Sequence, residues 1–489
     1  MRDGEQTPGV SLEPDKKVWI ARNLDALGVD VIEAGSAVTS EGERDGIKAV
    51  VKENLKAEIC SFARIVKSDI DYAIDCEVDS VHLVVPVSDL HITQKLRKDR
   101  ATVKETAARM VEYAKKHGLI VELSGEDASR ADLDYVLDVY KAGLEAGADR
   151  LCFCDTVGVL QPEGTYDIFR RLVTETRAPV SIHCHDDFGL ATANTVAALK
   201  AGASQAHVTV NGVGERAGNT ALEEVVIVLK SLYGVDTRIV LENIYPTSKL
   251  VSRLMGIPVA PNKSLVGDNA FMHESGIHVH GLIANTATYE PITPETIGRK
   301  RQIVLGKHAG RSTVELSLKG FGLSATDPQL DEITRQVKCL GDKGKHVTDA
   351  DLMSIADSVL GKHTEARIKV IDCTILSGNH ATPTSSVKLT IDGHEVVESG
   401  VGVGPVDAAL NALRRAVSGV ADIKLDEYRV EAITGGTDAL VEVWVKMSRD
   451  GRVISARGAG PDIIMASVQA FVEGMNRLIQ EKNGVAKKI

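Results

Sequence analysis

Two histidines separated by one residue, in the stretch VSIHCHDD, are the clearest chemical signal in the sequence. In an extended strand, residues i and i+2 project from the same face, so His183 and His185 can reach one metal ion together. Two polar residues at the rim of a sheet would be the simpler explanation. A carboxylate from another strand end would complete a three-ligand site with open positions for a substrate.

The first residues of the chain, MRDGEQ, offer that carboxylate. Asp3 is the candidate third ligand, and Asn219 in NGVGERAGN can supply a weaker oxygen ligand. Beside a metal, Arg2 would stabilise the negative charge that develops when a 2-oxo acid is attacked at its carbonyl. By its position alone, Arg2 would be a solvated side chain at a fraying terminus. The strand pattern of the chain favours the role beside a metal.

A second histidine pair lies in GIHVHG. His278 or His280 can act as a general base, because imidazole titrates near neutral pH and can take a proton from an activated carbon acid. Ordinary exposure of polar residues in a loop explains this pair equally well.

Seven apolar runs alternate with helical stretches between residues 20 and 230. Runs this apolar, each followed by a helix, predict buried parallel strands. The stretches 102–118 and 132–147 carry apolar residues at helical spacing and end in glycine, which predicts helices. The predicted strands are 29–35, 57–63, 80–86, 119–127, 150–158, 180–187 and 205–212.

Polar residues collect at the carboxyl ends of these strands, where parallel barrels build their active sites. This distribution indicates an enzyme. A closed barrel has eight strands, so we predict that RDGEQ is the carboxyl end of a first strand, and we expect the body of that strand ahead of Met1. The predicted fold class is α/β, a (β/α)8 TIM barrel with its first strand truncated. The polar residues are Glu33, Arg64, Glu126, Asp155, Thr156, Asp186, Asp187 and Asn211.

Beyond residue 235 the alternation of apolar runs and helical stretches becomes less regular. The stretch 266–291 is predicted to be loop and short helix, and 327–341 and 348–361 are predicted to be capped helices. With 489 residues, the chain exceeds what one hydrophobic core supports. We predict a catalytic barrel over 1–235, helical subdomains with a catalytic flap over 236–364, and a regulatory domain over 365–489.

The last of these parts contains an internal repeat. Residues 398–417 and 454–475 both run from strand through Gly-x-Gly-Pro into an amphipathic helix, each after alternating strand patterns, with a hairpin turn at Asp450–Gly451. Two βββα units therefore predict a small α+β domain. Glycines at a helix start free backbone N–H groups for an anion such as a carboxylate, although turn geometry alone also accounts for them. The candidate regulatory residues are Gly402, Gly404, Gly458, Gly460 and Asp462.

The composition excludes several classes of protein. A net charge of −11 argues against nucleic-acid binding, and no apolar run approaches 18 residues, which argues against a membrane span. Seven cysteines, an odd number, without a signal peptide predict a cytoplasmic protein. One basic group, Lys95, Arg97, Lys98 and Arg100, is either a solvated face or a loop that meets a phosphorylated substrate.

Eight ordered motifs resemble the isopropylmalate, citramalate and homocitrate synthases, a family of acyl-CoA condensing enzymes. They are RDGEQTPGV, VDVIEAG, SGEDASR, CDTVGV, IHCHDDFGLATAN, NGVGERAGN, SGIH and LGKHAGR. The resemblance implies a Claisen-type condensation of acetyl-CoA with a 2-oxo acid, followed by thioester hydrolysis. It also implies a domain-crossed homodimer and an amino-acid-binding regulatory domain.

The same resemblance implies roles for individual residues. Asp3, His183 and His185, with Asn219 near them, correspond to the ligands of a divalent metal, which can be zinc, manganese, magnesium or cobalt. Arg2 corresponds to the arginine that polarises the keto oxygen. The other implied residues are Thr156 at the substrate carboxylate, Glu126 beside the reacting carbons, His278 at the acetyl methyl group, Tyr289 in the same flap, and His82 and Ser124 in the substrate pocket.

Four stretches resemble the archaeal-type citramalate branch of the family more than the isopropylmalate branch: 32–43, 57–64, 81–91 and 153–159. The expected substrates are therefore acetyl-CoA and pyruvate, the expected product is (R)-citramalate, and isoleucine is the expected feedback ligand. Condensation with 2-oxoisovalerate, as in leucine biosynthesis, is the alternative. A lyase of the same barrel superfamily and a non-catalytic amino-acid sensor are less favoured.

Overall fold

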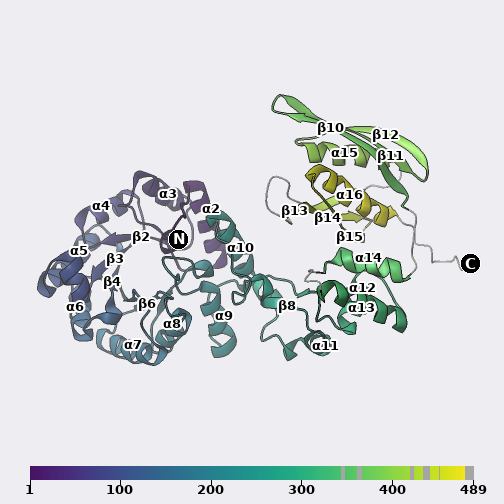
Figure 1. The fold of residues 1–489 in the computed structure, drawn as a ribbon. Helices are drawn as coiled ribbons and strands as arrows, with labels where there is room; N and C mark the ends of the chain where they lie inside the picture. The colour runs from purple at the N-terminus through teal and green to yellow at the C-terminus, as the bar shows by residue number, and fades with distance from the viewer. Residues whose placement is uncertain (343–346, 361–365, 419–422, 433–440, 451, 480–489) are drawn as a thin grey trace, which may run out of the picture. The chain divides into compact units, whose positions relative to one another are not determined.

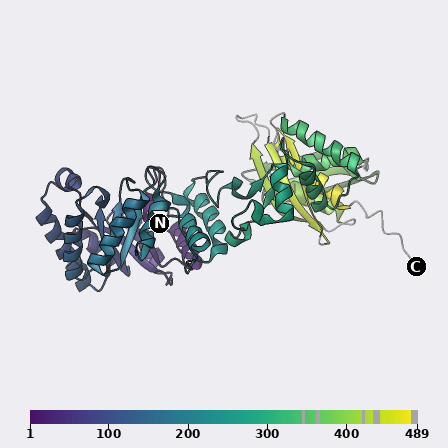
Figure 2. The same cartoon turned by 90° about the horizontal axis from the view of Figure 1, so that it is seen from below.

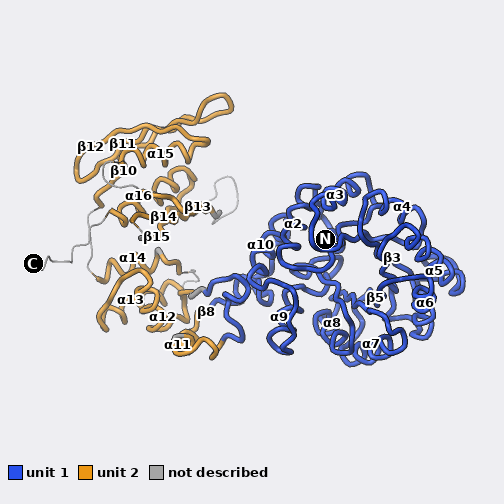
Figure 3. The backbone as a smooth tube through the Cα atoms, turned by 180° about the vertical axis from the view of Figure 1, so that it is seen from behind, with its two compact units in different colours: residues 1–272, 290–302 blue, residues 273–289, 303–489 orange. Residues whose placement is uncertain are grey.

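The computed structural model describes residues 1–489 except 343–346, 361–365, 419–422, 433–440, 451 and 480–489. The predicted boundary between 364 and 365 and the predicted turn residue Gly451 thus touch residues outside the described ones. The chain divides into two compact units, one of residues 1–272 and 290–302 and one of residues 273–289 and 303–489 (Figure 3).

The first unit contains a parallel sheet in which each strand pairs with the next one along the chain (Figure 1). All seven predicted strands are confirmed. Most side chains of β1 to β6 are buried and many are aliphatic, as expected for strands covered on both faces, whereas the three residues of β7 are half-buried. The strands are β1 Val31–Gly35, β2 Glu58–Arg64, β3 Ser80–Pro86, β4 Ile120–Glu126, β5 Arg150–Asp155, β6 Val180–Cys184 and β7 Gln205–His207.

Helices follow the strands and surround them in Figure 1. Several begin at a side-chain cap: Ser40, Asp99 and Asp132 each accept a hydrogen bond from a backbone N–H of the following turn. The helices are α2 Pro14–Leu27, α3 Glu41–Val51, α4 Lys67–Asp75, α5 Arg100–Lys116, α6 Leu133–Glu145, α7 Pro162–Thr176, α8 Ala191–Lys200, α9 Leu222–Tyr233 and α10 Ile244–Met255.

Strands β1 and β7 each have one neighbour in the described sheet. Arg2–Glu5, predicted to end a strand, instead form the single helical turn α1, because the backbone N–H groups of Glu5 and Gln6 bond back to Met1 and Asp3. The helical turn places the side chains of Arg2 and Asp3 among the carboxyl ends of the strands. The parallel sheet and its surrounding helices are the TIM-barrel architecture that was predicted.

The second unit begins with helix α11 and a group of helices with its own aliphatic core, α12, α13 and α14. The predicted loop and short helix over 266–291 and the two predicted helices are confirmed, but Gly341, predicted to cap the first, lies inside α13, and Gly361, predicted to cap the second, lies outside the described residues. Within the described residues, no helix is long and apolar enough to cross a membrane. The elements are β8 Met272–His273, α11 Gly276–Ala284, β9 Gln302–Ile303, α12 Arg311–Gly320, α13 Asp327–Asp342 and α14 Asp349–Leu360.

The predicted internal repeat is also confirmed. Two antiparallel three-stranded sheets each carry one helix against one face, α15 on the first and α16 on the second (Figures 1 and 2). Apolar residues of both sheets and both helices form one core. The first copy is β10 Ile368–Gly378, β11 Ala381–Ile391, β12 His394–Val401 and α15 Pro405–Val417; the second is β13 Lys424–Ala432, β14 Val441–Arg449, β15 Arg452–Gly460 and α16 Ile463–Ile479.

Candidate active site

Three predicted metal ligands converge at the carboxyl end of β6. The Nε2 atom of His183 lies 3.4 Å from Nε2 of His185 and 3.4 Å from Oδ2 of Asp3. All three side chains are buried, and one ligand atom from each lies within 4.8 Å of the other two. The i, i+2 spacing on a strand, together with the turn α1, therefore brings these three residues to one point.

Backbone and side-chain contacts orient the groups around this point. The Nδ1 atom of His185 lies 3.2 Å from the carbonyl oxygen of Gly218, which leaves Nε2 facing the cluster. Asn219 pairs with His185 in an isolated bridge, and its Nδ2 donates to the carbonyl of Val213. Among the described residues, the Oδ1 atom of Asn219 has no hydrogen-bond partner.

The donor set fits a divalent cation. Oδ2 of Asp3 and Oδ1 of Asn219 are buried and accept no hydrogen bond from the described residues. Such orphaned oxygens are costly unless another group satisfies them. Burial lowers the pKa of His183 to about 3, which keeps its imidazole in the neutral form that coordinates metals. Two imidazoles, a carboxylate and an amide oxygen suit zinc, manganese, cobalt or magnesium.

Arg2 is fixed beside this cluster. Its Nε donates to Oε2 of Glu33 at 2.9 Å, and its guanidinium lies over the ring of Phe62, 4.6 Å from the centroid. Another guanidinium nitrogen lies 3.4 Å from Oδ1 of Asp3. The arginine is thus held in one orientation next to the candidate metal ligands, whereas its place in the sequence would predict a frayed side chain.

Glu33 was not predicted as a site residue, and it connects Arg2 to the substrate-pocket candidates. Its Oε1 lies 2.7 Å from Nδ1 of His82, and Nε2 of His82 lies 2.6 Å from Oγ of Ser124. Burial acts to raise the pKa of Glu33, but the charges of Arg2 and His82 keep this pKa well below the usual range. The signal was present in the sequence as a lone glutamate inside the apolar run VDVIEAG.

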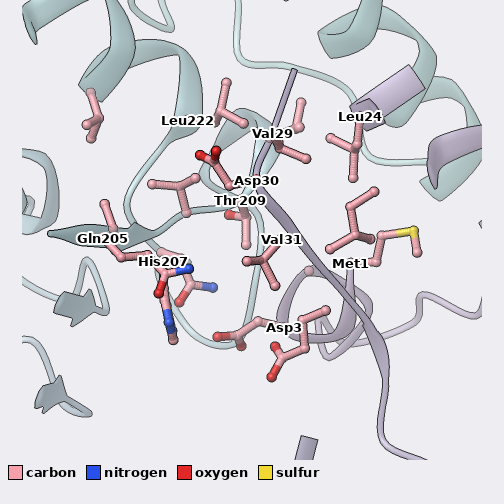
Figure 4. A pocket seen from close by; sticks show the side chains of 18 of the residues that line it. Met1, Asp3, Leu24, Val29, Asp30, Val31, Gln205, His207, Thr209 and Leu222 are labelled. Carbon is pink, nitrogen blue, oxygen red and sulfur yellow. The ribbon is translucent and has the colours of Figure 1, made fainter. Parts of the chain in front are cut away.

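A second buried pair that sequence reasoning missed lies deeper in the sheet. Nε2 of His207 lies 2.9 Å from Oε1 of Glu122. Burial acts to lower the pKa of His207, but the carboxylate of Glu122 raises it to about 9. Both residues line a cavity of about 330 Å³ together with Arg2, Asp3 and His183. Figure 4 shows this cavity, with the apolar Leu24 and Val29 toward the top of the view, His207 at the left and Asp3 at the bottom.

Glu126 and Thr156 stand at the ends of β4 and β5. Both carboxylate oxygens of Glu126 accept from Nζ of Lys95, at 2.7 and 2.9 Å. Oγ1 of Thr156 accepts from the backbone N–H of Asp127 at 2.8 Å. Glu122, Ser124 and Glu126 alternate along β4 and therefore project from the same face, toward the centre of the sheet.

The predicted flap residues belong to the second unit. The rings of His278 and Tyr289 stack with centroids 4.2 Å apart, and His278 also lies near the ring of His273, at 6.4 Å. His278 and His280 are both exposed on helix α11. The second unit therefore pairs His278 with Tyr289, and the first unit holds the other predicted catalytic residues.

The candidate regulatory residues stand at the junctions between strand and helix in the two repeats. A Cβ at Gly402 would lie 2.4 Å from the backbone nitrogen of Ala408, and one at Gly458 would lie 2.1 Å from the carbonyl oxygen of Ala466. Both positions thus require glycine for close packing. Gly404 and Gly460 face open space, and Oδ1 of Asp462 accepts from the backbone at the start of α16.

Comparison with family models matches three consecutive parts of the chain. A model described as HMGL-like matches residues 1–251. One described as homocitrate synthase post-HMGL domain-like matches residues 265–345, and one described as the LeuA allosteric (dimerisation) domain matches residues 346–479.

Two relatives are similar over nearly their full length. A protein of Methanosarcina mazei, provisionally named (R)-citramalate synthase CimA, is 64% identical over 481 residues, which cover 98% of this chain and 100% of the relative. The (R)-citramalate synthase CimA of Methanocaldococcus jannaschii is 57% identical over 481 residues, which cover 98% of each chain.

Proposed function

The chain belongs to the HMGL-like family, and on this premise we propose that it condenses acetyl-CoA with pyruvate and water to give (R)-citramalate and CoA. The observation that carries this proposal is the similarity to (R)-citramalate synthases over the whole chain, at 57% and 64% identity. The product is the entry compound of a threonine-independent isoleucine route, so the enzyme acts in branched-chain amino-acid biosynthesis.

A divalent metal fits the first step. Asp3, His183 and His185 would hold it, with Asn219 beside them, because two of their oxygens are buried without a partner. When bound, the metal supplies Lewis-acid polarisation of the 2-oxo carbonyl. Arg2, fixed by Glu33 and Phe62, stabilises the negative charge that develops on the same oxygen.

Formation of the new carbon–carbon bond requires a base. In our proposal His278 takes a proton from the acetyl methyl group, and the resulting carbanion attacks C2 of pyruvate. Stacking on Tyr289 orients the imidazole of His278, and Glu126, at the end of β4, is proposed to act beside the reacting carbons. The keto oxygen is protonated to a hydroxyl, and water then cleaves the thioester to release the CoA thiol.

His82, Ser124 and Thr156 are proposed to bind pyruvate. The hydrogen bonds from Glu33 through His82 to Ser124 fix the two pocket side chains relative to Arg2. Thr156 offers its hydroxyl at the neighbouring strand end, where it is suited to hold the substrate carboxylate. Pocket size then discriminates between 2-oxo acids, and one or two methyl groups carry about 1–3 kcal/mol of that discrimination.

One assay tests the proposal. Release of free CoA thiol from acetyl-CoA is measured with pyruvate and with 2-oxoisovalerate as co-substrates. We expect a higher kcat/KM with pyruvate. The match to the LeuA domain favours 2-isopropylmalate synthesis as the second candidate, and a preference for 2-oxoisovalerate would establish that activity instead.

The match to the LeuA allosteric (dimerisation) domain indicates allosteric regulation and dimerisation. We propose that a feedback amino acid, isoleucine, binds with its carboxylate at the open glycines Gly404 and Gly460, near Asp462. Adding isoleucine and leucine separately to the thiol-release assay tests this. Inhibition by leucine alone would contradict it.

A further inference from the structure

The last residues of strands β1–β7 and the loops that follow them carry six lysine and arginine residues among the described residues, and four of them are paired with carboxylates. The pairs are Arg64 with Asp69, Lys95 with Glu126, Arg130 with Asp127, and Arg216 with Asp187. Arg97 and Lys98 are the remaining two. Both are exposed, and neither has an ion pair or hydrogen bond from its side chain to the described residues.

Arg97 and Lys98 lie in the segment Val87–Lys98, which we call the β3 loop. This loop contains a π-helical turn, His91–Leu96, that ends at Arg97 with a φ of 53°. Single π-helical turns are rare and concentrate at functional sites, and a left-handed conformation is strained for a residue with a long side chain. Ile92 is buried and anchors the turn, so the backbone that carries Arg97 and Lys98 is held in place.

The β3 loop is bonded to the catalytic strand end of β4. Oγ of Ser88 donates to Oδ2 of Asp127 at 2.5 Å, and the backbone N–H of Val87 donates to the carbonyl of Glu126. Nζ of Lys95 binds both carboxylate oxygens of Glu126. The free cations therefore lie on the same short segment that holds Glu126.

We propose that the β3 loop binds the phosphate groups of acetyl-CoA through Arg97 and Lys98. The proposal rests on the proposed function, since it assigns a subsite for the nucleotide end of that substrate. In a chain with a net charge of −11, two unpaired cations at the active-site end of the sheet match a ligand that carries several phosphate charges. The other cations of these loops are occupied by their carboxylate partners.

The same arrangement couples binding to chemistry. Lys95 holds the Glu126 carboxylate in this structure, and it lies two residues from Arg97 on the same turn. A phosphate bound by Arg97 and Lys98 draws the Lys95 ammonium toward itself and away from Glu126. The carboxylate is then released beside the reacting carbons only when the thioester substrate is present.

Kinetics with two thioesters test the subsite. The double variant Arg97→Asn, Lys98→Gln removes both charges and keeps a side chain that tolerates the left-handed conformation at position 97. We expect KM for acetyl-CoA to rise about tenfold, because charged hydrogen bonds to phosphate are lost. KM for pyruvate and kcat/KM for acetyl-pantetheine, which has no nucleotide, should stay unchanged.

The matched control is Arg109→Asn, Arg170→Gln, which removes two exposed charges from the outer helices α5 and α7. We expect this control variant to leave KM for acetyl-CoA unchanged. If the loss of any two positive charges raised KM, the control would raise it as well. A higher salt concentration should weaken acetyl-CoA binding to the wild type and to this control. The same change should weaken binding to the loop variant much less. An equal loss with acetyl-CoA and acetyl-pantetheine, or no loss with either, would overturn the proposal.

Calorimetric titration with CoA and with pantetheine separates this proposal from the proposed function. A wild type that binds CoA more tightly than the loop variant, yet releases no thiol with any 2-oxo acid, would support the subsite and contradict the condensation. Thiol release with pyruvate, together with equal CoA affinity in wild type and loop variant, would support the condensation and contradict the subsite.

Discussion

Two histidine pairs with the same H-x-H spacing occur in this chain, and they have opposite geometries. His183 and His185 lie on strand β6, buried, with their Nε2 atoms 3.4 Å apart. His278 and His280 lie on helix α11, where residues two apart are separated by a rotation of about 200° around the helix axis and so point to nearly opposite sides. The spacing alone therefore carries no chemical meaning; the element on which it occurs decides whether two imidazoles act together or separately.

Burial also separates the two regions. Around the strand pair, the orphaned Oδ2 of Asp3 lies 3.4 Å from His183, and Asn219, which bridges His185, carries a second orphaned oxygen, which makes the site suited to a cation. Around the helix pair, the exposed His278 has two ring neighbours, Tyr289 and His273. The strand pair is thus arranged to bind one ion with both imidazoles, whereas in the helix pair each imidazole acts separately.

The largest expected effect comes from removing one histidine of the strand pair. His183→Ala should lower kcat by roughly 10³-fold or more, because a ligand of the polarising metal is lost. Bound metal, measured by mass spectrometry of the dialysed protein, should fall together with activity. His117→Ala, an exposed histidine at the end of α5, is the control and should retain both. Full metal content in His183→Ala would contradict the site.

The helix pair should respond unequally to substitution. His278→Ala should lower kcat by roughly 10²-fold to 10⁴-fold, as expected for loss of a general base, whereas His280→Ala should leave kcat nearly unchanged. Metal content should be the same in both variants. Similar losses from both substitutions would mean that the two imidazoles of α11 act as a pair after all.

The burial of one carboxyl group in the first unit predicts a pH-dependent stability. Burial raises the pKa of Glu223, on α9, from 4.5 to about 7. The unfolded chain therefore loses this proton first, so the contribution of Glu223 to stability is largest below pH 4.5 and is lost as the pH rises to 7. At pH 8, Glu223→Gln should be more stable than the wild type by about 3 kcal/mol.

Thermal unfolding at pH 8 and pH 4.5 measures this difference, which should vanish at the lower pH. The exposed Glu163→Gln is the control and should change the free energy of unfolding by less than about 0.5 kcal/mol at either pH. A difference for Glu223→Gln that is equal at both values would show that its carboxyl group titrates normally.

The smallest expected effect concerns the support of His278. A Cβ at Gly281 would lie 2.7 Å from Cε2 of Tyr289, so Gly281→Ala should push that ring away from His278. We expect kcat to fall roughly tenfold with metal content unchanged, because the imidazole loses its orientation. Gly42→Ala, on the exposed face of α3 with no atom nearer than 4.0 Å, is the control. Unchanged kcat in Gly281→Ala would separate the stack from catalysis.

The sequence predicted the strands well because their signal is local. Apolar runs such as SVHLVVP, bounded by helical stretches, need no knowledge of distant residues to be recognised. The repeat was equally visible, since Gly-x-Gly-Pro occurs twice at matching positions. The convergence of Asp3 with His183 also followed from a general rule about where parallel barrels place polar residues.

The missed residues depend on register, which the sequence does not contain. Glu122 and His207 are 85 residues apart, and they meet only because β4 through β7 align as they do. Glu33 is recognisable in the sequence as a polar residue at a strand end, but its position between Arg2 and His82 depends on how β1 pairs with β2 and β2 with β3. The helical form of Arg2–Glu5 likewise had no periodic signal, since four residues are too few to show one.

The two βββα copies in the second unit have a consequence for tolerance to mutation. Gly402 and Gly458 each face a backbone atom of the helix in their own copy, Ala408 and Ala466 respectively. A larger residue at either position displaces that copy's helix, and because both copies share one core, the displacement also disturbs the packing of the other copy. Duplication of this unit therefore provides no spare; it gives the domain two separate points at which a single substitution disables it.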